Sequence, residues 1–243
     1  MIDTHCHIDL YDDPLSVAQE AERLGIITIG MTNLPSHFEM GYPHLLSFRK
    51  VRLALGMHPL YAESHLKEFN KFKNNLDKTS YIGEIGLDFS REGYPTKAIQ
   101  IETFRKILTA IRGKKKLLSL HSRRAEKEVL AELISYDIQS AIFHWYSGPV
   151  SLISKITAQG FYFSINSAMI QSPNGQKIIS SIPKEKILTE SDGPFIEHNG
   201  KPVRPADLKM VYNYLSKAWS MSIEEVGSQI KGNFKELIAS IAP

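Results

Sequence analysis

Five short apolar segments of this 243-residue chain each end at side chains that can bind a metal ion. The side chains at the five ends are His5 with His7, Glu84, His121, His144 and Asp192. Each stands where a run of strand-forming residues gives way to polar loop sequence. We therefore expect five strand ends to meet at one pocket, an arrangement that indicates a hydrolase with two metal ions.

Strand-like runs alternate with amphipathic segments that have helical periodicity. The eight runs are Ile2 to His5, Ile26 to Met31, Val51 to Leu55, Tyr81 to Ile85, Leu117 to Leu120, Ala141 to Phe143, Gly160 to Ile165 and Lys186 to Leu188. Helices expected between them include Pro14 to Leu24, Pro95 to Ile111, Ala125 to Ser135 and Val150 to Gln159. This pattern predicts an α/β fold, a TIM-type (β/α)8 barrel with its site at the carboxyl ends of the strands. An open doubly wound sheet would not gather residues from five different strand ends.

We expect residues 1–243 to form one barrel domain. Ser36 to Lys50 is predicted to be a helix interrupted by Gly41-Tyr42-Pro43, and Gly193 to Pro205 a loop at the rim of the pocket. Three further helices are expected on the outside of the barrel. They are Ala206 to Trp219, Ser222 to Ile230 and Asn233 to Ile241.

The composition is that of an ordinary globular chain and favours no particular partner. The net charge is +3 and the isoelectric point is near 8.8, far from the dense positive charge of a nucleic-acid arm. Cys6 is the only cysteine, so an intrachain disulfide is excluded and a reducing cytoplasm is expected. No apolar run approaches the roughly 18 to 20 residues of a membrane span, and no leader segment is evident.

His5 and His7 alternate onto the same face of a strand, so both imidazoles can reach one metal. A satisfied polar patch is an equally good interpretation of this pair alone. Asp3 and Asp9 are candidates to accept an imidazole N–H, although Asp9 also fits a solvated loop residue.

Glu84 lies in an otherwise apolar strand, where an unpaired carboxylate would be costly. We expect it to bridge two metals, with Gly83 and Gly86 permitting close approach of the neighbouring backbone. Pairing with a buried arginine or lysine is the alternative. Asp88 is interpreted either as a residue that orients a ligand or as a turn residue.

His121, His144 and Asp192 each follow an apolar strand. The two histidines together with Glu84 make a plausible second metal site of mixed nitrogen and oxygen ligands, although either histidine alone is more typical of a structural one. Asp192 can hold the first metal and take a proton from a water molecule, or it can be a turn residue.

Several charged and aromatic residues follow strand ends and can meet an anionic substrate that contains bases. They are His58, Arg123, Arg124, Lys201, Arg204, Phe89, Tyr94, Trp145, Tyr146 and Phe195. His58 is predicted to contact substrate or support a ligand. Ordinary packing at the rim is the alternative interpretation of each aromatic residue. Lys114, Lys115 and Lys116 precede a strand and should be solvated, and His37, His44 and His65 are expected to be exposed.

Seven motifs jointly resemble the TatD family of metal-dependent deoxyribonucleases over essentially the whole chain. They are Asp3-Thr4-His5-Cys6-His7, Gly56-Met57-His58-Pro59, Gly83-Glu84-Ile85-Gly86-Leu87-Asp88, His121-Ser122-Arg123, His144-Trp145-Tyr146-Ser147-Gly148, Glu190-Ser191-Asp192-Gly193-Pro194 and Gly232-Asn233-Phe234. The resemblance implies a TIM-type barrel, two divalent cations and cleavage of DNA phosphodiester bonds in single strands or from 3′ ends. Zn, Mn and Ni suit the ligand types, and Mg suits them less well.

The resemblance also implies roles for individual residues. His5, His7, Glu84 and Asp192 would hold one metal, and Glu84, His121 and His144 the other. Asp192 would act as the base, and Arg123 and Arg204 would meet the substrate. The chain departs from the family pattern at Trp145-Tyr146, where Cys-Phe is more usual, and at Lys201-Pro202-Val203-Arg204-Pro205, where an Arg-Asn pair is typical.

Ser122-Arg123-Arg124-Ala125 and His144-Trp145-Tyr146-Ser147-Gly148 also resemble QatD, the TatD-like component of bacterial Qat anti-phage systems. That resemblance implies work alongside an ATPase and other Qat defence-system proteins. Alternative functions are an amidohydrolase, an aminoacyl-tRNA deacylase on the same barrel, and a non-catalytic subunit of a defence complex. Amidohydrolases with a carboxylated lysine need a lysine where this chain has Glu84.

Overall fold

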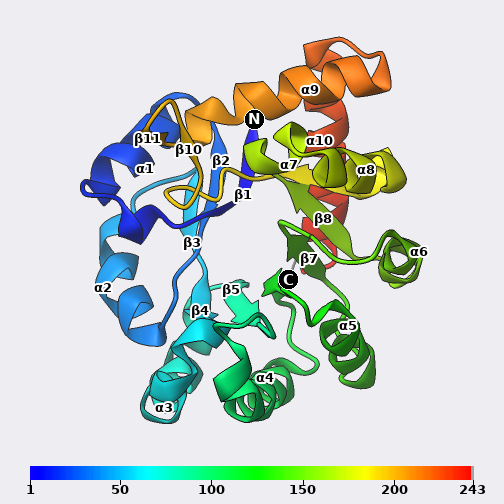
Figure 1. Cartoon of the computed structure of the whole chain (residues 1–243). Helices are drawn as coiled ribbons and strands as arrows, with labels where there is room; N and C mark the ends of the chain where they lie inside the picture. The colour runs from blue at the N-terminus through cyan, green and yellow to red at the C-terminus, as the bar shows by residue number, and fades with distance from the viewer. Residues whose placement is uncertain (242–243) are drawn as a thin grey trace.

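A computed structural model describes residues 1–241 and shows parallel strands surrounded by helices (Figure 1). Within these residues the parallel strands are β1 (Ile2–Cys6), β2 (Ile27–Gly30), β3 (Val51–Leu53), β4 (Leu55–Met57), β5 (Tyr81–Gly86), β6 (Leu117–His121), β7 (Ala141–His144), β8 (Tyr162–Ile165) and β9 (Ile187–Thr189). They pair in chain order as two sheets, β1-β2-β3 and β4-β5-β6-β7-β8-β9. The predicted third strand is divided at Ala54 into β3 and β4, so the eight expected strand positions are all present.

Hydrogen bonds join the two sheets into a closed barrel. At one junction, the Ala54 N–H donates to the carbonyl of Gly30 over 2.7 Å. At the other, β9 meets β1: the Thr4 hydroxyl donates to the Thr189 carbonyl over 3.2 Å, and the Asp192 N–H donates to the His5 carbonyl over 2.9 Å. The predicted α/β barrel is therefore confirmed.

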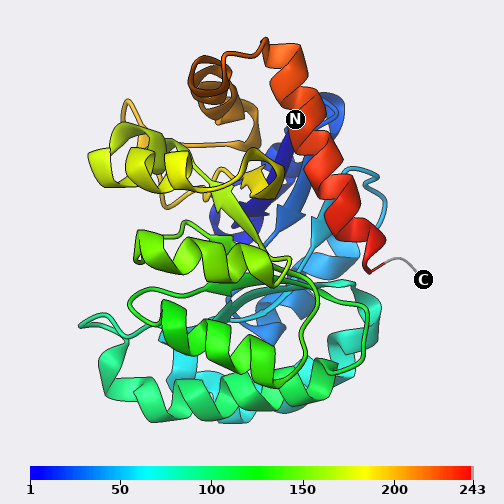
Figure 2. The same cartoon turned by 90° about the vertical axis from the view of Figure 1, so that its right-hand side faces the viewer.

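Helices cover the outside of the barrel, and Figure 2 shows three of them, α4, α5 and α6, side by side. The α-helices are α1 (Pro14–Arg23), α2 (Pro35–Leu45), α3 (His65–Asn75), α4 (Lys97–Ile111), α5 (Glu126–Ser135), α6 (Val150–Ala158), α7 (Ser167–Gln171), α8 (Pro173–Ser181), α9 (Lys209–Trp219) and α10 (Ile223–Ala239). Short 3-10 helices are η1 (Ile8–Leu10), η2 (Pro59–Ser64), η3 (Leu76–Lys78), η4 (Tyr94–Thr96), η5 (Lys184–Lys186) and η6 (Pro205–Leu208).

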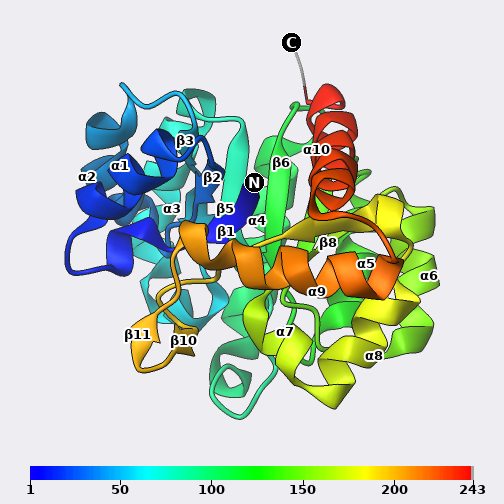
Figure 3. The same cartoon turned by 90° about the horizontal axis from the view of Figure 1, so that it is seen from above.

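Two predictions about the helices are wrong. The predicted pair Ser222 to Ile230 and Asn233 to Ile241 is one continuous helix, α10, which runs alongside the barrel (Figure 3). Asn233 lies inside this helix, and its side-chain amide donates to the carbonyls of Lys184 and Ile187, both at 2.7 Å. In the same way α2 continues through Gly41 and Pro43 to Leu45, where an interruption was expected.

The loop after β9 is more ordered than its glycine and proline content indicates. It contains a short antiparallel hairpin of β10 (Glu197–His198) and β11 (Lys201–Pro202). The apolar core is a continuous cluster in which most residues of the parallel strands are buried, as in other barrels of this kind. Within residues 1–241 no helix is both long and apolar enough to cross a lipid bilayer.

Candidate metal centre

The barrel brings the six predicted metal-ligating side chains into one cluster at the carboxyl ends of the strands. His5 lies on β1 and Glu84 on β5, while His121 and His144 are the last residues of β6 and β7. His7 follows β1, and Asp192 follows β9. Ring nitrogens and carboxylate oxygens within 4.8 Å of one another form three overlapping groups. These groups are His5 with His144 and Asp192, His5 with His7 and Glu84, and His58 with Glu84 and His121.

The two carboxylate oxygens of Glu84 face different sets of imidazoles. Oε2 lies 3.2 Å from Nε2 of His7 and 3.5 Å from Nε2 of His5. Oε1 lies 2.6 Å from Nδ1 of His121 and 2.9 Å from Nε2 of His144. A carboxylate placed in this way can share one oxygen with each of two adjacent cations.

Close contact between strands gives Glu84 this central position. Gly86 has φ +137°, and a Cβ there would lie 2.0 Å from the carbonyl oxygen of His121. A Cβ at Gly83 would lie 2.9 Å from Cβ of Ser119 and 2.7 Å from the sulfur of Met31. The absence of a side chain at Gly83 and Gly86 therefore permits β5 to lie close to its neighbours. This close approach was predicted from the sequence.

Asp192 is the second carboxylate that faces His5 and His7. Its Oδ1 lies 3.6 Å from Nε2 of His5 and 3.9 Å from Nε2 of His7. Its backbone has φ +47°, a conformation uncommon for a residue other than glycine, and it is fixed by the hydrogen bond to the His5 carbonyl. Burial raises the pKa of Asp192 well above its ordinary value, and the nearby carboxylates of Glu190 and Glu84 add to the effect.

The partners of Glu84 fit a metal site better than an ion pair with arginine or lysine. Burial alone would raise the pKa of Glu84, but the imidazoles of His58, His144 and His121 outweigh it and hold the pKa well below its ordinary value. Every charged partner of Glu84 found within residues 1–241 is a histidine, so the alternative of a buried arginine or lysine is not supported. Imidazoles and carboxylates that converge without a lysine or arginine among them are a donor set that suits divalent transition metals.

Two neighbours hold the histidine rings in place. The Ser119 hydroxyl lies 2.8 Å from Nδ1 of His5, and Oδ2 of Asp88 lies 2.7 Å from Nε2 of His121. Asp88 is thus positioned to orient a ligand, one of its two predicted roles. Asp3 was expected to accept an imidazole N–H, but its Oδ1 accepts the backbone N–H groups of His5 and Ser191 instead.

Glu190 is a part of the site that the sequence analysis did not single out. It is fully buried and accepts hydrogen bonds from the Trp145 N–H at 3.0 Å, the Asn166 amide at 2.8 Å and the Ser164 hydroxyl. Its Oε1 also lies 3.6 Å from Nδ1 of His144. The available signal was a second acidic residue directly after the apolar strand β9, two positions before Asp192.

Two histidines lie deeper than predicted. Nε2 of His58 is 3.3 Å from Oε1 of Glu84, so His58 belongs to the same cluster as His121 and His144. His65, expected to be exposed, is 3% exposed, and its Nε2 lies 3.0 Å from the carbonyl oxygen of His58. The 3-10 helix η2 connects His58 to His65 and brings the His65 ring back to the His58 carbonyl, where it is buried.

A cavity of about 500 Å³ opens over the cluster and includes several of the predicted substrate contacts. Its lining residues are His7, His58, Leu60, Glu84, Asp88, His121, Ser122, Arg123, His144, Trp145, Ser147, Asp192 and Phe195. Trp145 and Phe195 are 37% and 58% exposed, so part of each side chain is accessible to a ligand.

The structure corrects two predicted substrate contacts. Tyr146 is 1% exposed, its ring packs against Phe163, and its hydroxyl donates to the Pro149 carbonyl at 2.8 Å. Tyr146 is therefore a packing residue of the loop that follows β7, and it does not face the cavity. Arg204 does not line the cavity, because its guanidinium group faces the carboxylate of Glu20 at 3.3 Å.

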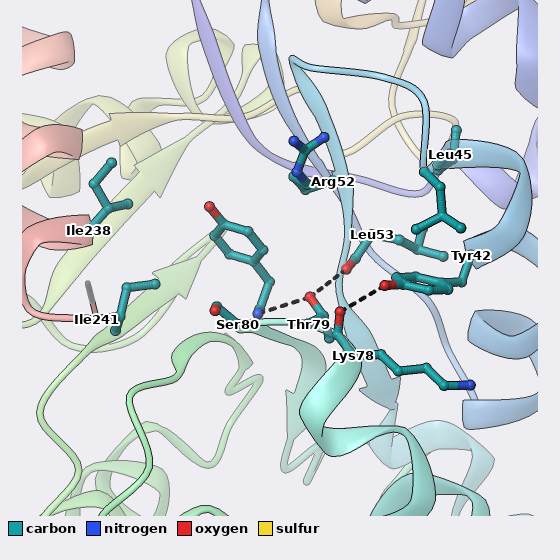
Figure 4. Close-up of a pocket in the computed structure, with 11 residues that line it drawn as sticks. Tyr42, Leu45, Arg52, Leu53, Lys78, Thr79, Ser80, Ile238 and Ile241 are labelled. Carbon is teal, nitrogen blue, oxygen red and sulfur yellow. Dashed lines mark hydrogen bonds between the residues drawn. The ribbon is translucent and has the colours of Figure 1, made fainter. Parts of the chain in front are cut away.

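A second cavity, of about 580 Å³, lies beside β3 and the amino end of β5 (Figure 4). Ile238 and Ile241 lie on one side of it, and Tyr42 and Leu53 on the other. No histidine, aspartate or glutamate lines this cavity within the part of the chain that the structure describes. The groups with catalytic chemistry therefore lie at the carboxyl end of the barrel, where such barrels place their active sites.

Comparisons with known proteins agree with this geometry. The sequence profile of a family described as TatD related DNase matches residues 2–239. An uncharacterized metal-dependent hydrolase of Methanocaldococcus jannaschii is 30% identical over 245 residues, which cover 96% of this chain and 94% of that protein. The human deoxyribonuclease TATDN3 is 25% identical, with 93% of this chain and 90% of that protein covered.

Solved structures show the same fold. The crystal structure of YjjV, a TatD homolog from Escherichia coli K12, matches with a TM-score of 0.88 at 22% identity and covers 100% of this chain and 98% of that one. A TatD family hydrolase from Entamoeba histolytica matches with a TM-score of 0.81 at 18% identity, covering 98% and 97%.

Proposed function

Because this chain belongs to the TatD related DNase family of metal-dependent hydrolases, we propose that it hydrolyses phosphodiester bonds of DNA, at 3′ ends or in single strands. The observation that carries the proposal is the division of the Glu84 carboxylate between two sets of imidazoles. A phosphodiester needs charge stabilisation on both the attacked and the departing side, which two adjacent cations provide.

The proposed ligands follow from the distances around Glu84. His5, His7, Glu84 and Asp192 would hold one divalent cation, and Glu84, His121 and His144 the other. His58 lies beside the second position, which makes it either a further ligand or a contact to the substrate phosphate. Bound cations would supply Lewis acidity to the phosphoryl group and to the attacking water.

Asp192 is the proposed general base. Water attacks phosphorus, and Asp192 accepts its proton. The bond from phosphorus to the departing sugar oxygen breaks, and that oxygen takes up the proton from Asp192, directly or through water, which returns Asp192 to its carboxylate form. The products are one alcohol and one phosphomonoester. Arg123 can hold a non-bridging phosphate oxygen, and Trp145 and Phe195 can stack a base at the mouth of the cavity.

A substrate panel tests this proposal. Protein stripped with a chelator and then reloaded with Zn, Mn, Ni or Mg is assayed on single-stranded DNA, duplex DNA, RNA and an aminoacyl ester. We expect metal-dependent cleavage of DNA and its loss in Asp192→Asn. Preferential hydrolysis of the aminoacyl ester would point to a deacylase, and the absence of any metal-dependent hydrolysis would point to a non-catalytic subunit.

We also propose that this activity serves anti-phage defence together with other Qat proteins. The support is the resemblance of the segments around Arg123 and Trp145 to QatD. Phage plating on cells that carry the complete system, with wild-type chain or Glu84→Gln, tests the idea. Equal protection by the wild type and Glu84→Gln would show that defence does not require hydrolysis by this chain.

A further inference from the structure

We infer that Arg124 binds a second phosphate of the substrate strand, one that lies outside the catalytic cavity. The inference rests on the proposed function, since it deepens the substrate class from a phosphodiester to an extended nucleic-acid strand. Such a subsite would make the enzyme prefer longer strands to the shortest ones that contain a cleavable bond.

Hollows continue from the catalytic cavity across the loop that follows β6. Arg123 lines the catalytic cavity and also two neighbouring hollows, of about 240 and 510 Å³. Arg124 lies in both outer hollows, and Ser147 is shared by the cavity and the larger one. A strand that leaves the cavity past Arg123 therefore meets Arg124 next.

The arginines on this path lack carboxylate partners. Within residues 1–241 no ion pair involves Arg91, Arg123 or Arg124, whereas Arg105 pairs with Glu132 at 2.7 Å. A guanidinium group without an internal anion is available to a phosphate, which it can bind through two parallel hydrogen bonds.

The backbone presents the two arginines from a fixed loop. The Phe89 N–H donates to the Arg123 carbonyl at 2.9 Å, and the Ala125 N–H donates to the Ser122 carbonyl at 2.9 Å. Arg124 itself has φ +57°, in the left-handed region. A side chain held on a fixed loop loses less entropy when it binds a ligand than one on a mobile segment does.

The larger hollow is the better candidate for the second phosphate. The smaller one is also lined by the acidic Glu92, whose charge disfavours an anion there. In the larger one the only acid is Glu126, which is 8% exposed and forms the wall against Gly148. A Cβ at Gly148 would lie 2.7 Å from Glu126 and from the Tyr146 hydroxyl, so glycine keeps this wall open.

The test compares Arg124→Gln with Arg112→Gln. Arg112 follows the last residue of α4 at the opposite end of the barrel and is exposed, so its replacement removes the same charge from a remote place. Length preference is measured as the ratio of kcat/KM for a ten-nucleotide single strand to kcat/KM for a dinucleotide. We expect Arg124→Gln to lower this ratio about fivefold or more, and Arg112→Gln to leave it unchanged.

A binding experiment in chelator separates the subsite from catalysis. Fluorescence anisotropy with a labelled ten-nucleotide strand should show weaker binding to Arg124→Gln and a shallower salt dependence, by roughly 0.7 in the slope of log K against log salt. If the wild type binds the strand in this way but cleaves nothing, the subsite stands and the proposed function fails. If Arg124→Gln matches Arg112→Gln in both experiments while the wild type cleaves DNA, the subsite is refuted.

Discussion

The hydroxyl of Ser119 lies 2.8 Å from Nδ1 of His5, in the interior of the barrel. This contact occupies the ring nitrogen that faces away from the cluster and leaves Nε2 directed at Glu84 and His7. A metal-binding histidine usually has its second nitrogen held in this way, which fixes the orientation of the ring. Ser119 is therefore a supporting residue of the proposed first metal position.

Ser119→Ala should weaken metal binding at that position by about 10- to 100-fold without unfolding the protein. The expected cost in the free energy of unfolding is about 1 kcal/mol, from the lost hydrogen bond. Isothermal titration calorimetry of the metal-free protein measures the affinity, and Ser181→Ala, at an exposed position, is the control. Equal affinities for the two variants would contradict the role given to Ser119.

Glu84→Gln should remove both metals together, because one carboxylate serves both positions. Turnover is expected to fall by about three orders of magnitude, as when a group that organises a whole site is lost. Mass spectrometry of the intact protein counts the bound ions. Retention of one tightly bound ion would show that the two positions do not share Glu84.

The sequence predicted the barrel and the convergence of the ligands because both depend on local patterns. Apolar runs that end in His5, Glu84 or Asp192 identify strands and their carboxyl ends, and a parallel barrel places those ends together. Element boundaries near proline and glycine were less predictable. Pro43 lies inside α2, and the chain passes Gly232 within α10 without a break.

Positions that depend on tertiary contacts were the ones missed. Tyr146 looks like a rim aromatic in sequence, but its contact with Phe163 buries it. Glu190 became recognisable only through its hydrogen bonds to Asn166 and Trp145, which come from other strand ends. Contacts of this kind join residues that are far apart in the sequence, so no sequence spacing predicts them.

Gly86→Ala should destabilise the fold strongly. The added Cβ would lie 2.0 Å from the His121 carbonyl, and φ +137° is a conformation that alanine rarely adopts. We expect a loss of more than about 3 kcal/mol in the free energy of unfolding. Gly113→Ala is the matched control, because Gly113 also has positive φ, +71°, but has open space around its Cβ position, and should cost only about 1 kcal/mol. Urea denaturation of the two variants measures the difference, and equal losses would show that strands β5 and β6 do not approach this closely.

His65 should make the stability of the metal-free protein depend on pH. Burial lowers its pKa from 6.5 to about 4 in the folded state, so between these values the unfolded chain binds a proton that the folded chain does not. The free energy of unfolding therefore falls as the pH falls through this window, by about 2 kcal/mol between pH 7 and pH 5 for this residue. His65→Gln should lose that part of the pH dependence, whereas His44→Gln, at an exposed position, should keep it. Urea titrations at the two pH values in the presence of chelator measure the effect, and parallel behaviour of His65→Gln and the wild type would mean that His65 is not buried as a neutral ring.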